Sequence, residues 1–255
     1  MTTKLYDLSV PVGYMTPGWM GHQPGPDRVL ERVLRHENPI GPGLSRRLSV
    51  YLGGWHAGTH VDAQNHHVEG GTPCDKMPLE SFYGTGVIVD FRYMKKWQIV
   101  TAADLEKATP KIEPGDIVLM NTGWHHYWRV NDYVYYNHYP GLYVEAGEWL
   151  LEKKVKMVGG TWGASDSPLA HYPLRAAYPY LYEEYIKETG KDPDKEFPIY
   201  EPCHQIFCTN MIPHIENVGG DIDEVTGKRC TIAAFPFRLE GSFGHMLRVV
   251  AIVEE

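Results

Sequence analysis

The sequence predicts an α/β fold in a single domain covering residues 1–255, and three observations support this prediction. Stretches with strand character alternate with stretches of helical periodicity, an order that favours a sheet covered by helices. A chain of 255 residues is long enough for one large domain with a substantial core. Its composition, with 43% hydrophobic and 22% charged residues, is typical of a globular protein.

The first half of the chain contributes predicted strands, a long loop and a helix start. The predicted strands are residues 4–10, 44–54 and 84–91. Residues 12–27 are rich in glycine and proline and are expected to form a loop. Thr101 is expected to cap a helix, because its hydroxyl can accept a backbone N–H and Asp104 places a negative charge in the first turn.

The second half continues the alternation. A strand is expected at 114–124, a helix at 144–154, where apolar residues recur at helical spacing, and a further short strand at 156–162. The apolar runs 230–239 and 245–253 are expected to pair as strands.

Residues 171–202 interrupt this order. The segment is rich in tyrosine, proline and charged residues, and we expect an inserted helix and loop that form a lid or an oligomer contact. Its aromatic content leads us to expect a homo-oligomer, a dimer or a tetramer.

A cluster of potential metal ligands lies in the stretch HAGTHVDAQNHH. His56, His60, Asp62 and His66 fall within eleven residues, followed directly by His67. Imidazole and carboxylate groups are the ligands that hold zinc or manganese. The intervals of 4, 2 and 4 residues give the first four the same parity, so an extended strand would point them to one face.

The chain must bend inside this cluster. On a straight strand His56 and His60 would lie about 13 Å apart, near the limit for two imidazoles that share one ion. Gly58 and Thr59 lie at the point of the expected bend, and glycine tolerates the backbone angles that it needs. We therefore expect a strand that continues into a kinked loop.

Charge and sequence pattern exclude some functions. A net charge of −8 argues against a nucleic-acid surface, which would need a basic stripe. No stretch approaches 18 apolar residues and the N-terminus lacks the pattern of a secretory signal, so we expect no membrane partner and a cytoplasmic location. No glycine-rich phosphate motif is present.

The motif His56-x-Gly58-Thr59-His60-x-Asp62-x-x-x-His66 resembles the signature of the cyclase family of metal-dependent hydrolases. Members of that family include bacterial kynurenine formamidase and isatin hydrolase. Further blocks resemble the family in the same order, namely DLSVPV, GDIVLMNTGW, PGLYVEAGEWLLEKKVKMVGG and FPFRLEGSFGHMLRVVAIV. The resemblance covers nearly the whole chain outside 171–202. It implies a mixed β-sheet or barrel-like core flanked by helices, of the swivelling β/β/α type.

The resemblance also implies how the metal ligands are shared. In the formamidase branch it assigns His56, His60 and Asp62 to a first ion, while Asp62 and Glu216 bridge to a second ion completed by His204. Glu216 follows His204 by twelve residues, which is the interval of that branch. Members like isatin hydrolase hold a single manganese, so the expected cofactor is one or two ions of Zn²⁺ or Mn²⁺.

Three further residues receive expected roles. His214 competes as a distant ligand, although a surface or loop histidine is the preferred interpretation. His66 occupies the motif position of the family's acid/base and is expected to move protons, with the orientation of a ligand as the alternative. Trp19 lies where the family places an aromatic side chain over the substrate ring, but it could equally anchor a partner chain.

The chain departs from the formamidase pattern at Gly160-Thr161-Trp162, where that branch tends to have an aspartate after the glycine. Ser165, Asp166 and Ser167 keep the following loop polar, and short formamidases lack the 171–202 insertion. Both departures leave the substrate open.

The residues and the resemblance together predict a metal-dependent hydrolase that uses metal-activated water to cleave the C–N bond of an aryl formamide or a cyclic amide. The expected substrate is a small molecule, aromatic or cyclic. The alternatives are a lactone hydrolase, a lyase or cyclase that stabilises an enolate, and a metal-binding protein without activity.

Overall fold

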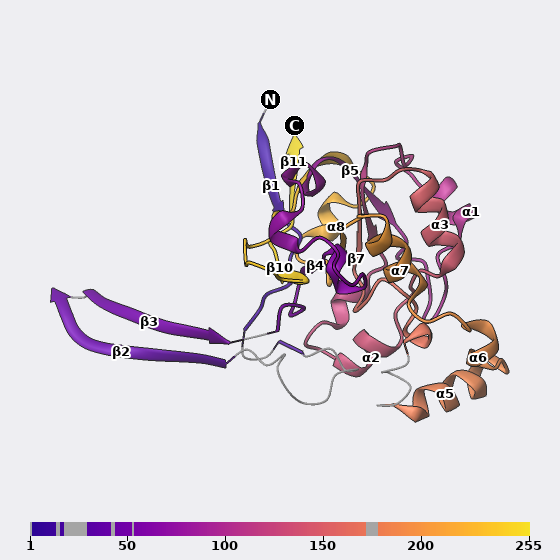
Figure 1. The fold of residues 1–255 in the computed structure, drawn as a ribbon, viewed down its shortest axis with the longest axis horizontal. Coiled ribbons are helices and arrows are strands. Elements are labelled where there is room, and N and C mark those ends of the chain that lie inside the picture. Colours follow the sequence, from indigo (N-terminus) through magenta and orange to yellow (C-terminus); the bar gives the residue numbers. More distant parts are fainter. Residues whose placement is uncertain (1, 14–15, 18–29, 42–43, 53, 172–177) are drawn as a thin grey trace.

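Nine strands form one mixed sheet in the order β1-β11-β9-β5-β6-β7-β8-β4-β10 (Figure 1). This computed structural model describes the chain except for residues 1, 14–15, 18–29, 42–43, 53 and 172–177, and along 30–52 it describes the backbone alone. The strands are β1 (Thr3–Asp7), β4 (His60–Asp62), β5 (Tyr83–Asp90), β6 (Ile117–Asn121), β7 (Met157–Gly160), β8 (His214–Glu216), β9 (Arg229–Ala233), β10 (Gly244–Met246) and β11 (Val250–Glu254). The β5–β6, β6–β7 and β7–β8 pairs are parallel and the others antiparallel.

Helices cover the sheet, which confirms the predicted α/β class with a mixed sheet. The α-helices are α1 (Ala102–Glu106), α2 (Asp132–Asn137), α3 (Val144–Glu152), α5 (Pro179–Thr189), α6 (Pro193–Glu196), α7 (Pro202–Thr209) and α8 (Ile222–Val225). Short 3₁₀ turns are η1 (Gln64–His66), η2 (Cys74–Lys76), η3 (Leu79–Phe82), η4 (Trp124–Tyr127) and η5 (Pro168–Ala170). Figure 1 shows α1, α3 and α7 on the same side of the body. No helix among the described residues has the length and apolar character needed to cross a bilayer.

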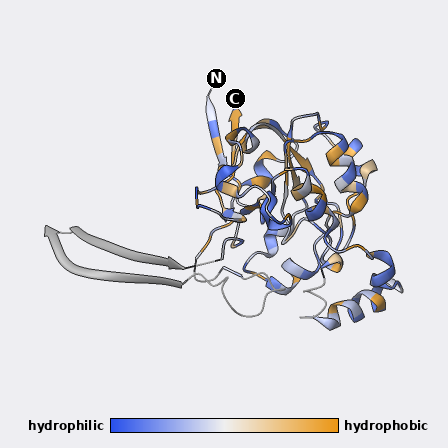
Figure 2. Ribbon diagram, in the orientation of Figure 1, coloured by the Kyte–Doolittle hydropathy of each residue, from blue (hydrophilic) through white to orange (hydrophobic). Residues whose placement is uncertain are grey.

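The sheet separates two hydrophobic cores because side chains alternate along its strands. On β5, Val87 and Val89 join one core, which continues into α1, α3 and α7, whereas Ile88 joins the other. β6 divides in the same way, and Ile117 and Leu119 lie in the second core beside α8. Both faces of these central strands are therefore buried, as expected for parallel strands with near-continuous apolar runs. In Figure 2 the central strands carry hydrophobic colour, whereas the helices around them carry both hydrophobic and hydrophilic colour.

Most of the predicted elements form. The predicted strands at 4–10, 84–91, 114–124 and 156–162 are β1, β5, β6 and β7, and the predicted helix at 144–154 is α3. Thr101 caps α1, since its hydroxyl accepts from the backbone N–H of Asp104, and the Asp104 carboxylate accepts from the backbone N–H of Thr101.

The C-terminal runs pair only in part. β9 and β11 pair as predicted, through Val250 opposite Ala233. The regular ladder ends there, and only an isolated bridge between Pro236 and Leu247 continues the pairing, while β10 joins β4 instead. Residues from the second run thereby reach the edge of the sheet that carries the histidine cluster.

Two parts of the chain lie outside the main sheet. β2 (Leu30–Gly41) and β3 (Leu44–Leu52) pair antiparallel as a separate two-stranded sheet, so the predicted strand at 44–54 exists but pairs with a partner that we did not predict. Figure 1 shows this hairpin extending away from the body.

The 171–202 segment contains the helices α5 and α6. It packs on the body through a small core in which Leu181 and Tyr185 contact Trp97 and Leu169. Figure 2 shows mainly hydrophilic colour over both helices. Its role as a lid or an oligomer contact stays a prediction.

Candidate metal centre

The site forms where β4 and β8 lie side by side in the sheet. Their antiparallel register places His60 opposite Glu216 and Asp62 opposite His214. Residues opposite each other, and residues two positions apart on one strand, share a face of the sheet. All four side chains therefore point to the same place, and all four are buried.

Asp62 lies at the centre of this arrangement. Five histidine nitrogens lie within 3.7 Å of its two carboxylate oxygens, from His56 (2.8 Å), His214 (3.2 Å), His60 and His204 (both 3.5 Å) and His66 (3.7 Å). Burial alone would raise the pKa of Asp62, but the charges of His56 and His66 and the close approach of His204 and His214 hold that pKa well below its usual range. Asp62 is therefore a carboxylate around which the ring nitrogens gather.

A bend places His56 beside Asp62. Gly58 has a φ of 63°, in the left-handed region that glycine adopts without strain, and this confirms the bend expected at Gly58 and Thr59. On the other side, Gly244 of β10 lies opposite Asp62, where a Cβ atom would meet the ring of His56. The missing side chain of Gly244 leaves the space that the imidazole of His56 occupies.

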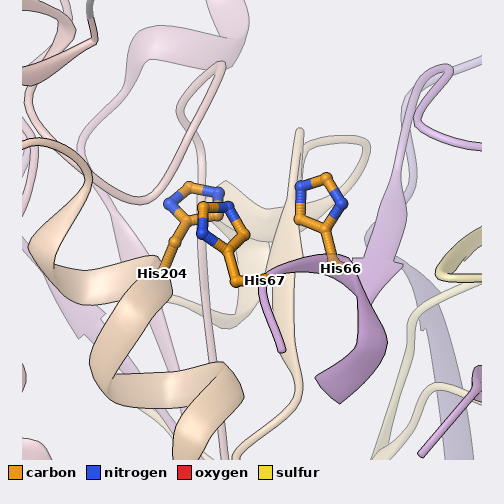
Figure 3. Close-up of side chains that lie close together, drawn as sticks. All are labelled: His66, His67 and His204. Carbon is orange, nitrogen blue, oxygen red and sulfur yellow. The ribbon is translucent and has the colours of Figure 1, made fainter. Parts of the chain in front are cut away.

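The expected one-face strand spacing holds for only part of the motif. His60 and Asp62 are on β4, whereas His66 ends the 3₁₀ turn η1. His66 and His67 are nevertheless brought back to the site, because η1 lies against α7. Figure 3 shows the ring of His67 beside that of His204 of α7, with His66 further away. The ring centroids are 5.1 Å apart for His67–His204, 4.8 Å for His66–His67 and 6.1 Å for His66–His204.

The polar loop after β7 orients two of the predicted ligands. Asp166 accepts hydrogen bonds from Nδ1 of His204 (2.6 Å) and from the backbone N–H groups of Cys203 and His204 at the start of α7. The backbone N–H of Ser165 donates to Oε1 of Glu216 at 2.8 Å. Asp166 thus fixes the imidazole of His204 so that Nε2 points towards Glu216 at 3.2 Å. The sequence analysis identified this loop as polar, but it did not predict that the loop orients His204 and Glu216.

His214 corrects a sequence-based interpretation. We preferred a surface or loop position for it, and this is wrong, because His214 is fully buried on β8 with Nε2 3.2 Å from Asp62. A signal was available in the sequence, since His214 and Glu216 have the same parity and would share one face of a strand. Trp19 lies outside the described residues.

The donor atoms are suited to a divalent ion. His60 Nε2, Asp62 Oδ1 and both ring nitrogens of His214 are buried without a hydrogen-bond partner among the described residues. Nδ1 of His60 lies 2.8 Å from the carbonyl oxygen of Gly58, which favours a proton on Nδ1 and a free lone pair on Nε2. Ligand atoms about 2.1 Å from one ion are about 3.0–3.4 Å apart, close to the spacings around Asp62. The residues present therefore fit a zinc or manganese ion.

The ligand-type atoms of the centre form three overlapping groups, one of which, His66, His67 and His204, contains no carboxylate. One group comprises Asp62, His204, His214 and Glu216, and another comprises His56, Asp62 and His66. Asp62 belongs to both, as a bridging carboxylate would. Of the five predicted ligands, His56, Asp62, His204 and Glu216 belong to these groups. His60 lies beside them, with Nε2 3.5 Å from both Asp62 and Glu216.

The fold and the site define an α/β protein with a buried cluster of histidine and carboxylate side chains suited to divalent metal. Residues 6–166 match the model of the Cyclase family. The chain belongs to the Cyclase family, as the resemblance of its histidine motif predicted.

Two relatives and two solved structures give the comparison its detail. A kynurenine formamidase of Erythrobacter litoralis is 34% identical over 162 residues, which cover 61% of this chain and 64% of the formamidase. An uncharacterised protein of Haemophilus influenzae is 27% identical over 108 residues, 42% of this chain and 76% of its own length. An isatin hydrolase bound to the product analogue thioisatinate shares the fold with a TM-score of 0.74 at 19% identity, over 99% of this chain and 93% of its own. Isatin hydrolase A from Ralstonia solanacearum gives a TM-score of 0.73 at 23% identity, over 99% and 92%.

Proposed function

We propose that this protein is a metal-dependent hydrolase that cleaves the C–N bond of an aryl formamide or a cyclic amide. The observation that carries this proposal is the convergence of buried, unpartnered donor atoms from His60, Asp62 and His214 on one point. Family membership and the likeness to a kynurenine formamidase support the reaction class. A divalent ion held there would polarise a carbonyl group and lower the pKa of water.

The ligands divide between two strands, a bend and a helix. His56, His60 and Asp62 would hold a first ion, and Asp62 with His204, Glu216 and His214 would hold a second. Asp166 keeps the ring of His204 in place, and the backbone of Ser165 does the same for Glu216. Because these supports come from buried positions, the ligands need little rearrangement to bind an ion.

We assign the movement of protons to His66. Its side chain is 27% exposed, more than that of His60, His204 or His214, so it can reach both the centre and an entering substrate. Burial, with the charges of neighbouring histidines, lowers the pKa of His66 to about 3 despite the opposing effect of Asp62. His66 is therefore a neutral imidazole at pH 7. A group with so low a pKa is a weak base, so its proposed part in proton movement rests on its position beside the centre.

Aromatic side chains beside the centre favour a planar substrate. Phe243 is 39% exposed and stacks on the rings of His56 and His66, with centroids 5.2 and 5.7 Å away. Trp55 packs against Phe243 at 4.5 Å. A planar ring could extend this stack at little entropic cost. Trp19 is proposed as a further aromatic contact to the substrate.

A substrate panel tests the proposal. The protein is stripped with a chelator, reconstituted separately with Zn²⁺ and Mn²⁺, and assayed with N-formyl anilines, isatin-like cyclic amides and lactones. We expect turnover of a formamide or cyclic amide that is lost on chelation and restored by one of the ions. Turnover of a lactone alone would move the assignment to that class, and failure with every compound and ion would contradict hydrolysis.

A further inference from the structure

A second group of metal-ligand side chains lies outside the candidate metal centre. His125 and His126 are adjacent on η4, and Asp223 lies on α8, almost one hundred positions later in the chain. One ligand-type atom from each lies within 4.8 Å of the other two. The group shares no residue with the candidate metal centre.

The Asp223 carboxylate presents one oxygen to both imidazoles. Oδ2 lies 2.8 Å from Nε2 of His126 and 3.5 Å from Nε2 of His125. These values bracket the spacing of about 3.3 Å expected between ligands of a tetrahedral ion with bonds near 2.0–2.1 Å. The rings lie close together, with centroids 4.1 Å apart.

The other carboxylate oxygen of Asp223 contacts two side chains outside the proposed ligand group. Oδ1 accepts a hydrogen bond from Nδ2 of Asn121 at 2.8 Å, and Nη1 of Arg92 lies 3.4 Å from it. Arg92 is itself held by Asp90, through contacts of 2.9 and 2.7 Å. The carboxylate is therefore oriented so that Oδ2 remains for the histidines, in the way that supporting hydrogen bonds orient metal ligands.

His125 gives the independent sign of a ligand. Its side chain is only 7% exposed, and its Nδ1 has no hydrogen-bond partner among the described residues. Its Nε2 faces Asp223 at a distance beyond that of a good hydrogen bond. Nε2 is therefore the nitrogen of His125 that could bind an ion beside Oδ2 of Asp223, since it makes no short hydrogen bond there.

We propose that His125, His126 and Asp223 form a second metal site that takes a borderline-soft divalent ion, zinc in the first instance. Two imidazoles and one carboxylate favour zinc over calcium or magnesium, which prefer oxygen ligands. His126 is 61% exposed, so an ion can enter from solvent, and water completes the coordination. A bound ion would join η4, which follows β6, to α8 on the other core.

Equilibrium dialysis against zinc, with elemental analysis of the protein, tests this site. We compare the wild type with His126→Ala and Asp223→Asn, and use Glu224→Gln as a matched control, because Glu224 is an exposed acid on the same helix. His126 is exposed, so its removal leaves the fold intact. We expect His126→Ala and Asp223→Asn each to bind one equivalent of zinc less than the wild type, and Glu224→Gln to bind the same amount.

An Asp62→Ala variant separates this site from the candidate metal centre. We expect it to retain one equivalent of zinc, with a rise in Tm on zinc addition that disappears when His126→Ala is added. Equal zinc binding by the wild type, His126→Ala and Asp223→Asn would overturn the proposal, as would loss of all zinc in Asp62→Ala. These experiments measure zinc binding and Tm, so their outcomes do not depend on whether the protein is a hydrolase.

Discussion

At the scale of single residues, the division between metal ligands and a proton-moving histidine is the sharpest part of the proposal. His60 and Asp62 offer buried donor atoms without other partners, whereas His66 is more exposed and lies at the largest distance from Asp62. We expect Asp62→Ala and His60→Ala to lose the metal bound at the candidate metal centre, together with activity. His66→Ala is expected to keep the metal and to lose about 10²–10⁴-fold in kcat.

Elemental analysis beside steady-state kinetics checks this division. Metal content equal to that of the wild type, with slow turnover, is the expected result for His66→Ala. If His66→Ala also emptied the centre, His66 would be a ligand, and the assignment of proton movement to it would be wrong.

His214 is the residue that the sequence analysis undervalued. Its nitrogens have no hydrogen-bond partner among the described residues and Nε2 faces Asp62, so we expect His214→Gln to weaken metal binding by about 10- to 100-fold. Metal affinity measured by competition with a chelator tests this. His245→Gln is the matched control, since His245 lies on the neighbouring strand β10 but outside the ligand groups. Equal affinity in both variants would show that His214 is only a packing residue.

At this scale the sequence predicted which residues meet, but not how they are held. The distant pair His204 and Glu216 joins the local motif as expected. The support from Asp166 and Ser165 was not predictable, because it depends on which loop the fold places behind α7 and β8. Pairing across the sheet, as between Asp62 and His214, likewise depends on a register that no local pattern contains.

At the scale of elements, a buried ion pair closes the base of the 171–202 segment. Nδ1 of His171 lies 2.6 Å from Oε1 of Glu201, and the backbone N–H of Glu201 donates to the carbonyl of Ala170. The two ends of the segment are thus tied together, and Glu201 also approaches His67 at 3.4 Å. The insertion therefore leaves and re-enters the body beside the candidate metal centre.

This pair gives a prediction about acid stability. Burial would raise the pKa of Glu201, but the hydrogen bond and charge of His171 outweigh it and lower the pKa from 4.5 to about 2. A carboxyl whose folded pKa is lowered stabilises the fold above its unfolded pKa and loses that contribution as the pH falls towards the folded pKa. We expect Glu201→Gln to lower the free energy of unfolding at pH 7 by roughly 1–3 kcal/mol.

Denaturant unfolding at several pH values measures this effect. The gap between the wild type and Glu201→Gln should narrow as the pH is lowered from about 4.5 towards 2, because the carboxylate is then protonated in both folded and unfolded chains. Glu188→Gln serves as a control, since Glu188 is an exposed acid at the far end of α5. A gap that does not change with pH would contradict the ion-pair explanation.

Strand and helix patterns predicted most of the elements that form, but they did not predict the order of the strands in the sheet. Alternating apolar residues located β5, β6 and β7, because both faces of those strands are buried. The position of β4 between β8 and β10 has no counterpart in the local sequence, since all three strands are short and pair across long chain separations. We did not predict β2, because its charged residues and proline interrupt the two-residue alternation of apolar and polar side chains that is typical of a strand.

At the scale of the whole molecule, the sheet brings together chain segments that a linear reading separates. The local motif on β4 and η1 meets α7 and β8 only because the parallel strands β5, β6, β7 and β8 place β8 beside β4. Assembly into a homo-oligomer stays a prediction. The central claim is that the buried cluster of histidines and carboxylates hydrolyses its substrate.

The incorporation of oxygen from ¹⁸O-labelled water tests that claim most directly. The metal-loaded enzyme is incubated with an N-formyl aniline or a cyclic amide in labelled water, and the acid product is analysed by mass spectrometry beside a chelated control. We predict one labelled oxygen per product molecule formed by the enzyme. Product formed at the same rate without the label would contradict hydrolysis and would indicate lyase or cyclase chemistry.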